Sequence, residues 1–270
     1  MRNFLYNATD ILGELRSPVC ISPDTIIRHA MSTATLEKVI CVCDRLSSDP
    51  FTECMIDAYR IGHNRFEDAW GYVDIASLLY AVTELGRPEN YLEIGVRRGR
   101  SSCMVVAANP ATKIYGFDLW QDDYANNINP GPEFVRGELK RMGHVGEAEF
   151  FSGDSHKTIP KFLNENEGLS FDLITVDGDH SKNGAWIDLT NVVSSLRLGG
   201  VIVFDDIDNP YCPGLADVWK RFMKNYSFLT GRILTNPLGL GVAFAIRVRK
   251  NDYNTSRESK KRWASWLKWP

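Results

Sequence analysis

Short apolar runs alternate with segments of helical periodicity over residues 71–248 of this chain. Apolar runs bounded by glycine, proline or polar residues are typical of buried strands, whereas apolar positions three and four apart favour helices. The predicted strands are 91–94, 113–117, 148–152, 171–176, 201–204, 232–235 and 242–248, and the predicted helices are 71–85, 101–108, 133–142, 160–164, 184–196 and 214–225. Alternation at this spacing predicts an α/β domain with right-handed crossovers and a mostly parallel sheet.

The last two predicted strands depart from this alternation. Only residues 236–241 separate them, and this stretch is too short for the crossover helix that a parallel pair would need. We therefore expect the two strands to form an antiparallel pair at the end of the sheet.

The two ends of the chain differ from its central part. Residues 1–70 contain no convincing strand pattern, while 34–40 and 53–60 have helical spacing. We expect a helical N-terminal segment, 1–70, that caps the central domain, 71–250, or joins two copies of the chain into a homo-oligomer. The basic tail, 251–270, contains three tryptophans. Its simpler interpretation is a helix packed on the body, and the alternative is an element that contacts a surface or membrane.

Composition places the chain among ordinary globular proteins. It has 270 residues, a net charge of -3 and 44% hydrophobic residues, so neither nucleic acid nor an anionic membrane is expected as a partner. No apolar run approaches the roughly 20 residues that span a bilayer, and the first residues lack the apolar core of a signal peptide. The six cysteines form no C-x-x-C pair. We interpret them as reduced thiols and expect a cytoplasmic location.

A glycine-containing turn follows the first predicted strand. It runs from Glu93 through Gly95 and Gly99 to Ser101, where a helix begins. Glycines let the backbone approach a ligand without an intervening Cβ, and the first turn of a helix offers free N–H groups. The spacing is Gly-x-x-x-Gly, not the Gly-x-Gly-x-x-Gly of dinucleotide enzymes. The turn predicts a nucleotide-like ligand at the edge where parallel α/β sheets bind ligands.

An acidic residue ends the second predicted strand, in the run Asp118-Leu119-Trp120. A carboxylate at this position can accept hydrogen bonds from both ribose hydroxyls of a bound nucleoside. The alternative is a turn cap, because aspartate is common at such positions. Since the glycine turn lies next to it, we expect Asp118 and Leu119 to contact the ligand. Trp120 could flank the ligand or pack internally.

Three further carboxylates follow two strands that should be neighbours in this fold. Asp177 ends the fourth predicted strand, and Asp205 and Asp206 end the fifth. Carboxylates so close together repel one another unless a positive charge lies among them. A hard divalent cation such as Mg²⁺ takes oxygen ligands and keeps positions open for water or substrate. We expect a metal site here, and the alternative is that these residues cap turns or face solvent.

Two sequence runs resemble those of metal-dependent O-methyltransferases that use S-adenosylmethionine (SAM). They are FDLITVDGDHS at 171–181 and LGGVIVFDD at 198–206. The glycine turn likewise resembles the first motif of class I methyltransferases. The group includes macrolide-sugar and aminocoumarin-sugar O-methyltransferases and, more distantly, catechol methyltransferases. The resemblance covers roughly 91–248 and implies a Rossmann-like class I methyltransferase fold.

The resemblance also implies roles for individual residues. Asp177, Asp205 and Asp206 would hold the divalent metal, and Asp177 would also lie beside SAM. His180 matches the general-base position of a macrolide-sugar methyltransferase, where the catechol type has lysine. The third ligand is asparagine in the catechol type and aspartate here, which aligns the chain with the sugar-modifying branch. Some members add a glutamate ligand, for which we place no equivalent.

The residues after the third predicted strand would meet the adenine in class I methyltransferases. In this chain they are Asp154 and Ser155, and either could instead be the N-cap of the following helix.

The mechanism that the resemblance implies is proton removal from a metal-bound hydroxyl, followed by attack on the SAM methyl group. His180, with an ordinary pKa of about 6.5, would accept the proton; the alternative is a turn histidine bonded to a neighbouring carboxylate. The acceptor would be a small molecule with a sugar or vicinal-diol hydroxyl, and the polar stretch 121–132 is a predicted lid or substrate loop.

Alternatives to a methyltransferase are a catalytically silent SAM or nucleotide binder, and a fold relative with another reaction. A dehydrogenase is disfavoured by the missing dinucleotide fingerprint.

Overall fold

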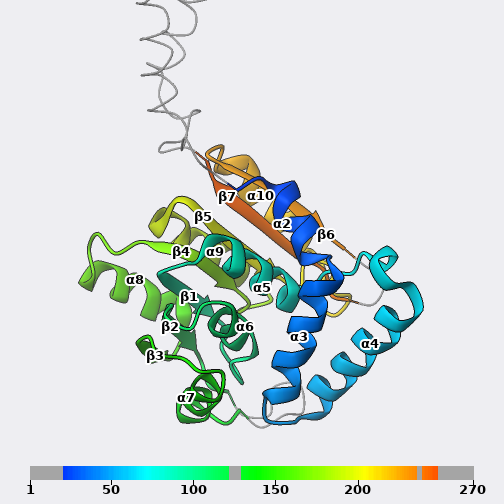
Figure 1. The fold of residues 1–270 in the computed structure, drawn as a ribbon. Coiled ribbons are helices and arrows are strands. Elements are labelled where there is room, and N and C mark those ends of the chain that lie inside the picture. The colour runs from blue at the N-terminus through cyan, green and yellow to red at the C-terminus, as the bar shows by residue number, and fades with distance from the viewer. Residues whose placement is uncertain (1–20, 122–128, 236–238, 249–270) are drawn as a thin grey trace, which may run out of the picture.

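The computed structural model describes residues 21–121, 129–235 and 239–248, and Figure 1 shows how they are arranged. A seven-stranded sheet with the order β3-β2-β1-β4-β5-β7-β6 lies at the centre. Its strands are β1 (Asn90–Ile94), β2 (Lys113–Asp118), β3 (Ala148–Ser152), β4 (Phe171–Val176), β5 (Leu196–Asp205), β6 (Leu229–Leu234) and β7 (Val242–Arg247).

Strand direction follows the prediction. The pairs β1–β2, β1–β4, β2–β3 and β4–β5 are parallel, while β7 runs antiparallel to both β5 and β6. The mostly parallel sheet and its antiparallel C-terminal pair are therefore confirmed. Because the chain moves from β1 to β3 on one side and resumes with β4 on the other, the strand order reverses between β1 and β4. Open α/β sheets bind ligands at such a switch point.

Helices cover both faces of the sheet, as Figure 1 shows. On one face α5 packs against α6, with α7 beside α6; on the other, α9 packs against α8 and α10. Their bounds are α5 (Ile75–Gly86), α6 (Arg100–Ala108), α7 (Pro132–Arg141), α8 (Ser155–Glu165), α9 (Lys182–Val192) and α10 (Leu215–Asn225). No helix in the described ranges has the length and apolar character needed to cross a membrane.

Strand β7 shows how the sheet separates two cores. Val242, Phe244 and Ile246 point into the core beneath α5 and α6, whereas Ala243 and Ala245 point into the core beneath α8, α9 and α10. Successive side chains of a strand point to opposite faces, so one strand supplies bulky groups to one layer and small groups to the other.

The N-terminal part of the described chain is helical, as predicted. It comprises α2 (Pro23–Ala30), α3 (Thr33–Arg45), α4 (Pro50–Phe66) and the short 3₁₀-helix η1 (Glu67–Trp70). Helix α2 packs on α5, and α3 packs on α5 and α6. Buried residues of these helices, including Ile26, Val39 and Tyr59, belong to the same core as β7's bulky face. The tail 251–270 and most of the 121–132 loop lie outside the described residues.

Several element boundaries differ from the predicted ones, mostly because of local caps. Helix α5 begins at Ile75 instead of residue 71, since Asp74 and Ser77 form a capping box. Helix α8 begins at Ser155 instead of residue 160, since the Asp154 carboxylate accepts from the His156 N–H. Pro160, the first residue of the predicted helix, lies inside the observed one.

The boundary between the fourth crossover helix and β5 was also misplaced. Helix α9 ends at Val192, and Leu196, predicted as helical, is the first residue of β5. The pairing of β5 with β4 shifts register between Phe171 and Leu173. This irregularity lets β5 begin before the glycines at 199–200 instead of after them.

Candidate active site

One large cavity lies at the carboxyl ends of the central strands. Its volume is about 960 Å³, near the upper end of the range for small-molecule sites. The segments that follow β1, β2, β3, β4 and β5 line it, and so do α4 and residues 70–76. The cavity therefore includes the switch point between β1 and β4.

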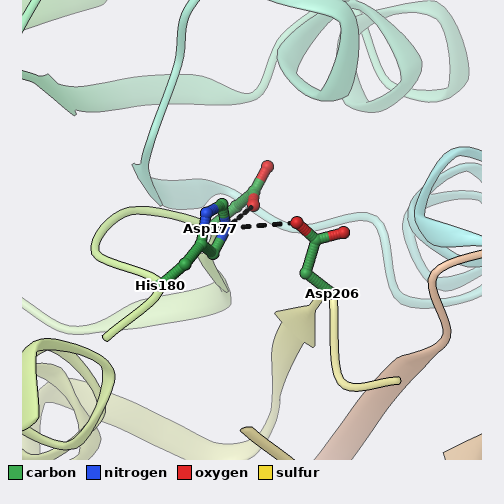
Figure 2. A group of neighbouring side chains, drawn as sticks. All are labelled: Asp177, His180 and Asp206. Atoms are coloured by element: carbon green, nitrogen blue, oxygen red, sulfur yellow. Dashed lines mark hydrogen bonds and ion pairs between the residues drawn. The ribbon is translucent and has the colours of Figure 1, made fainter. Parts of the chain in front are cut away.

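Three side chains at the tips of β4 and β5 come together in this cavity, as Figure 2 shows. Asp177 directly follows β4, Asp206 directly follows β5, and His180 lies just before α9. The His180 Nε2 atom is 3.1 Å from Asp177 Oδ1 and 3.3 Å from Asp206 Oδ2. One ligand atom from each side chain lies within 4.8 Å of the others, so this group could hold a metal ion.

Backbone geometry aims Asp206 into this group. Its φ is +57°, a left-handed value that is uncommon for a residue with a side chain. Asn209 supports the carboxylate, because its amide Nδ2 donates to Asp206 Oδ2 over 3.1 Å. Strained backbone of this kind is concentrated at functional sites.

The site carries an excess of negative charge. Burial, together with the charges of Asp177 and Asp206, raises the pKa of Asp205 well above its ordinary value. Burial and the charge of Asp177 likewise raise the pKa of Asp206. Burial alone would lower the pKa of His180, but its hydrogen bond to Asp177 and the nearby carboxylates raise it instead. A cation among these groups would relieve the same repulsion.

Asp205 does not belong to the group around His180. Among the described residues, the side chains close enough to share an ion are those of Asp177, His180 and Asp206. Asp205 is the last residue of β5, two positions after Val203, which points into the core beneath α5. Strand alternation therefore places Asp205 on the α5 side of the sheet. Its role as a metal ligand stays a prediction.

Asp74, which the sequence reasoning missed, brings another carboxylate to the α5 side. It accepts hydrogen bonds from the hydroxyls of Tyr59 and of Tyr72, the latter over 3.2 Å. Its charge contributes to the raised pKa of Asp205. The capping pattern Asp74-x-x-Ser77 was visible in the sequence and could have located the residue as a helix cap, although not its position beside the carboxylates.

The glycines of the β1–α6 turn are required by contacts within the protein. Gly95 has φ +88°, and a Cβ there would lie 1.9 Å from the backbone oxygen of Asp177. Gly99 has φ +72°, and a Cβ there would lie 2.6 Å from Val135 Cγ1. The atoms nearest to these added Cβ positions belong to the β4 tip and α7, and the close approach of a ligand to this turn stays a prediction. Gly95 itself lines the cavity, as does Ser101 at the start of α6.

Glu93 lies beneath this turn and is fully buried. It is absent from the residues that line the cavity, and Ser102 donates a hydrogen bond to one of its oxygens. The other oxygen, Oε1, is buried without a hydrogen-bond partner among the described residues. Burial, with the charges of Asp177 and Asp118, raises the pKa of Glu93 to about 8. A contact between Glu93 and a cofactor stays a prediction.

Asp118 and its neighbours occupy three different environments. The Asp118 carboxylate lines the cavity and accepts from the backbone N–H groups of Arg97 and Trp120, so it also acts as the predicted turn cap. Leu119 lines the cavity and is 60% exposed. Trp120 packs edge-to-face on Phe150, with ring centroids 6.0 Å apart, which favours internal packing.

The residues after β3 also line the cavity. Asp154 caps α8, and Ser155 donates its hydroxyl to the buried Asp188 over 2.7 Å. His156, which the sequence reasoning missed, lies beside them, with Nε2 at 3.6 Å from Asp188 Oδ1. Capping is therefore observed, and the predicted adenine contact stays open.

Comparison with known proteins finds a family model that is similar to the central part of this chain. Residues 92–207, from β1 to just beyond β5, match a family model described as a methyltransferase domain. This part of the chain is thus similar to methyltransferase domains, and the predicted class I, Rossmann-like fold is confirmed by the sheet order.

Individual proteins are similar to parts of this chain. The uncharacterized protein y4gI of Sinorhizobium fredii is 31% identical over 126 residues, which are 45% of this chain and 13% of that protein. The O-methyltransferase TomG of Streptomyces achromogenes, involved in tomaymycin synthesis and solved with SAM, is 22% identical, with a TM-score of 0.51 over 70% of this chain and 86% of TomG. An O-methyltransferase from Bacillus cereus, solved with S-adenosylhomocysteine, is 16% identical, with a TM-score of 0.51 over 80% of this chain and 91% of that one. These two likenesses concern the fold.

The contact at Gly95 predicts a severe effect of one added methyl group. Gly95→Ala should lower the free energy of unfolding by at least about 2 kcal/mol, because of left-handed strain and overlap with the Asp177 backbone. Gly137→Ala is the matched control, since Gly137 lies in α7 with nothing within 4 Å of an added Cβ. The control should be neutral or stabilising by up to about 1 kcal/mol. Urea denaturation measures both, and equal stabilities would contradict the contact.

The burial of Glu93 predicts a pH-dependent stability. Its pKa is about 8 in the folded protein, above the ordinary value of 4.5, so the folded state holds the proton more tightly than the unfolded chain. The favourable contribution is complete below about pH 4.5 and is lost as the pH rises through about 8. The stability of the parent protein should therefore fall relative to Glu93→Gln over this window. Denaturation without ligands at several pH values tests this, with Glu149→Gln, an exposed position, expected to behave like the parent. Parallel profiles for parent and Glu93→Gln would refute it.

Proposed function

We propose that this protein is a SAM-dependent O-methyltransferase that uses a divalent cation, with Mg²⁺ as the first choice, to methylate a hydroxyl of a small molecule. The observation that carries the proposal is the Asp177–His180–Asp206 group in the same cavity as the glycine turn. A binding protein without turnover would have no need of a histidine between two carboxylates at this place. The methyltransferase-domain match over 92–207 supports the same conclusion.

The residues at the β1, β2 and β3 tips fit SAM. Gly95 and Gly153 leave backbone exposed on the cavity wall, and Asp118 presents its carboxylate there. Asp118 would accept from the ribose hydroxyls, and Asp154 or Ser155 would meet the adenine. SAM supplies an electrophilic methyl group when it is bound. The fold's contribution is to hold donor and acceptor in the correct relative orientation.

The residues at the β4 and β5 tips fit a divalent cation. Asp177 and Asp206 offer carboxylate oxygens, which suit a hard cation, and the charge of Asp177 contributes to the raised pKa of Asp206 after burial, even though His180 and Asn209 act against it. Asp205 would add charge from the neighbouring position. When bound, the metal would act as a Lewis acid that lowers the pKa of a coordinated hydroxyl.

His180 would accept the proton of the acceptor's hydroxyl at its unprotonated ring nitrogen. The Nε2 atom faces both carboxylates at 3.1 and 3.3 Å, so they hold the ring in place and stabilise its protonated form. A proton-transfer group must be positioned before its pKa matters, and these contacts supply the positioning.

The acceptor would carry a sugar or vicinal-diol hydroxyl. The helical front would cover the acceptor side of the cavity, and a homo-oligomer and a cytoplasmic location complete the proposal.

Metal binding and SAM binding should respond differently to a change in the acidic group. Asp206→Asn should weaken Mg²⁺ binding at least about tenfold, because the site loses one charged ligand, while SAM affinity changes little. Asp217→Asn is the matched control, since Asp217 lies on α10 with a side chain 76% exposed. Isothermal calorimetry with SAM, with NAD and with Mg²⁺ or EDTA measures these affinities. Tight NAD binding, or no SAM binding, would overturn the proposed function.

His180 should be needed for turnover but not for binding. His180→Ala should retain SAM affinity and lose about 10²- to 10⁴-fold in methyl transfer, the usual contribution of a general base. The measurement is S-adenosylhomocysteine release with a panel of sugars and diols, using for the variant the acceptor on which the parent protein is fastest. Unchanged turnover would remove His180 from the mechanism.

A further inference from the structure

The cavity has two chemically different walls. The strand tips supply carboxylates, whereas the opposite wall is largely apolar and comes from the helical front. Phe51, Cys54, Met55 and Ala58 of α4 line it, and their spacing of three and four places them on one face of the helix. Trp70, just after α4, continues the same wall.

The apolar wall is held rigidly in place. An added Cβ at Gly62 would lie 2.0 Å from Trp70 Cζ2, so the indole lies directly on the backbone of α4. Trp70 also stacks on Tyr72, with ring centroids 4.6 Å apart and planes at 16°. The Tyr72 hydroxyl in turn donates to Asp74, the cap of α5. These contacts preorganise a flat aromatic surface.

Part of this wall is apolar surface left open to the cavity. Phe51 is 53% exposed, and Cys54 and Ala58 are exposed as well, although all three face the site. The amino-terminal end of α4 is tied to the glycine turn, because Asp49 lies 3.4 Å from Arg98 Nε and 3.6 Å from Arg100. A preformed apolar surface beside converging polar groups is the usual design of a small-molecule site.

The charge of the residues that line the cavity disfavours one class of acceptor. The described residues that line the cavity include seven aspartates, two arginines and no lysine. Arg100 is already engaged, since it donates to the Thr52 hydroxyl over 2.8 Å and faces Asp49. Away from the proposed divalent cation, a phosphate or diphosphate group would face carboxylates with little cationic compensation from the described lining residues, which is unfavourable at these short distances.

We propose that the acceptor is an uncharged small molecule with a flat apolar body, and that the α4–Trp70 wall binds this body while the hydroxyl reaches Asp177 and Asp206. The inference rests on the proposed function and narrows it, because nucleotide-activated sugars and other phosphate-bearing acceptors are disfavoured. The residues of the α4–Trp70 wall then determine which acceptors bind. Ala58 is the position in this wall where a larger side chain can be introduced without disturbing the core.

The test compares two probes on the full-length protein saturated with S-adenosylhomocysteine and Mg²⁺. One is a naphthalene diol with adjacent hydroxyl groups, and the other is thymidine diphosphate. Calorimetry should show the diol binding at least about tenfold more tightly than the diphosphate, a difference of about 1.4 kcal/mol. Undetectable diol binding, or diphosphate binding that equals or exceeds it, overturns the inference.

Variants of α4 locate the binding surface. Ala58→Trp should weaken diol binding at least about tenfold by filling the space beside Trp70, with SAM affinity unchanged. Ile61→Trp is the matched control, because Ile61 is a 67% exposed position of α4 that does not line the cavity. Equal diol affinity in the two variants overturns the inference, whereas failure of SAM binding in the parent protein overturns the proposed function instead.

Thiol labelling gives a measurement on the parent sequence. Cys54 and Cys41 are both exposed, but only Cys54 faces the cavity. The diol should slow maleimide reaction at Cys54 severalfold and leave Cys41 unaffected. Unprotected Cys54 under saturating diol contradicts the proposed location.

Discussion

The parallel pairing of β4 with β5 determines most of what this site can do. The pairing sets Val176 opposite Phe204, so the residues that follow each strand emerge at the same edge. Carboxylates placed there repel one another, and the raised pKa values of Asp205 and Asp206 reflect burial first and that repulsion second. The cores on the two faces of the sheet hold these carboxylates in place. Their charge is unfavourable by itself but would favour the binding of a cation.

Much of the fold could be predicted because its signals are local. The strands from β1 to β4 are bounded by residues that interrupt apolar runs, and their order in the chain implies crossovers. The errors occurred where local signals competed. The helix was predicted to start at Pro160, but it begins five residues earlier at Ser155, after the Asp154 cap. The apolar residues at the end of α9 suit both a helix and a strand. Leu196 belongs to the strand because it pairs with β4.

The site was predictable to the extent that topology brings its residues together. Asp177, His180 and Asp206 follow strands whose adjacency could be inferred, and they meet as expected. Asp205 is separated from this group because adjacent residues, here 205 and 206, point to opposite sides of the sheet. Asp74 and the α4 wall could not be located, since their contacts with the strand tips depend on how the helical front packs and no local pattern encodes it.

The contact between Gly62 and Trp70 has a consequence for how this protein can diversify. Gly62 lies on the side of α4 that supports the indole and does not line the cavity. Any larger residue at position 62 must displace Trp70, and the displaced ring would change the shape of the wall. The size of the acceptor site is thus under the control of a residue that no acceptor touches. A search for altered selectivity confined to lining residues would overlook it.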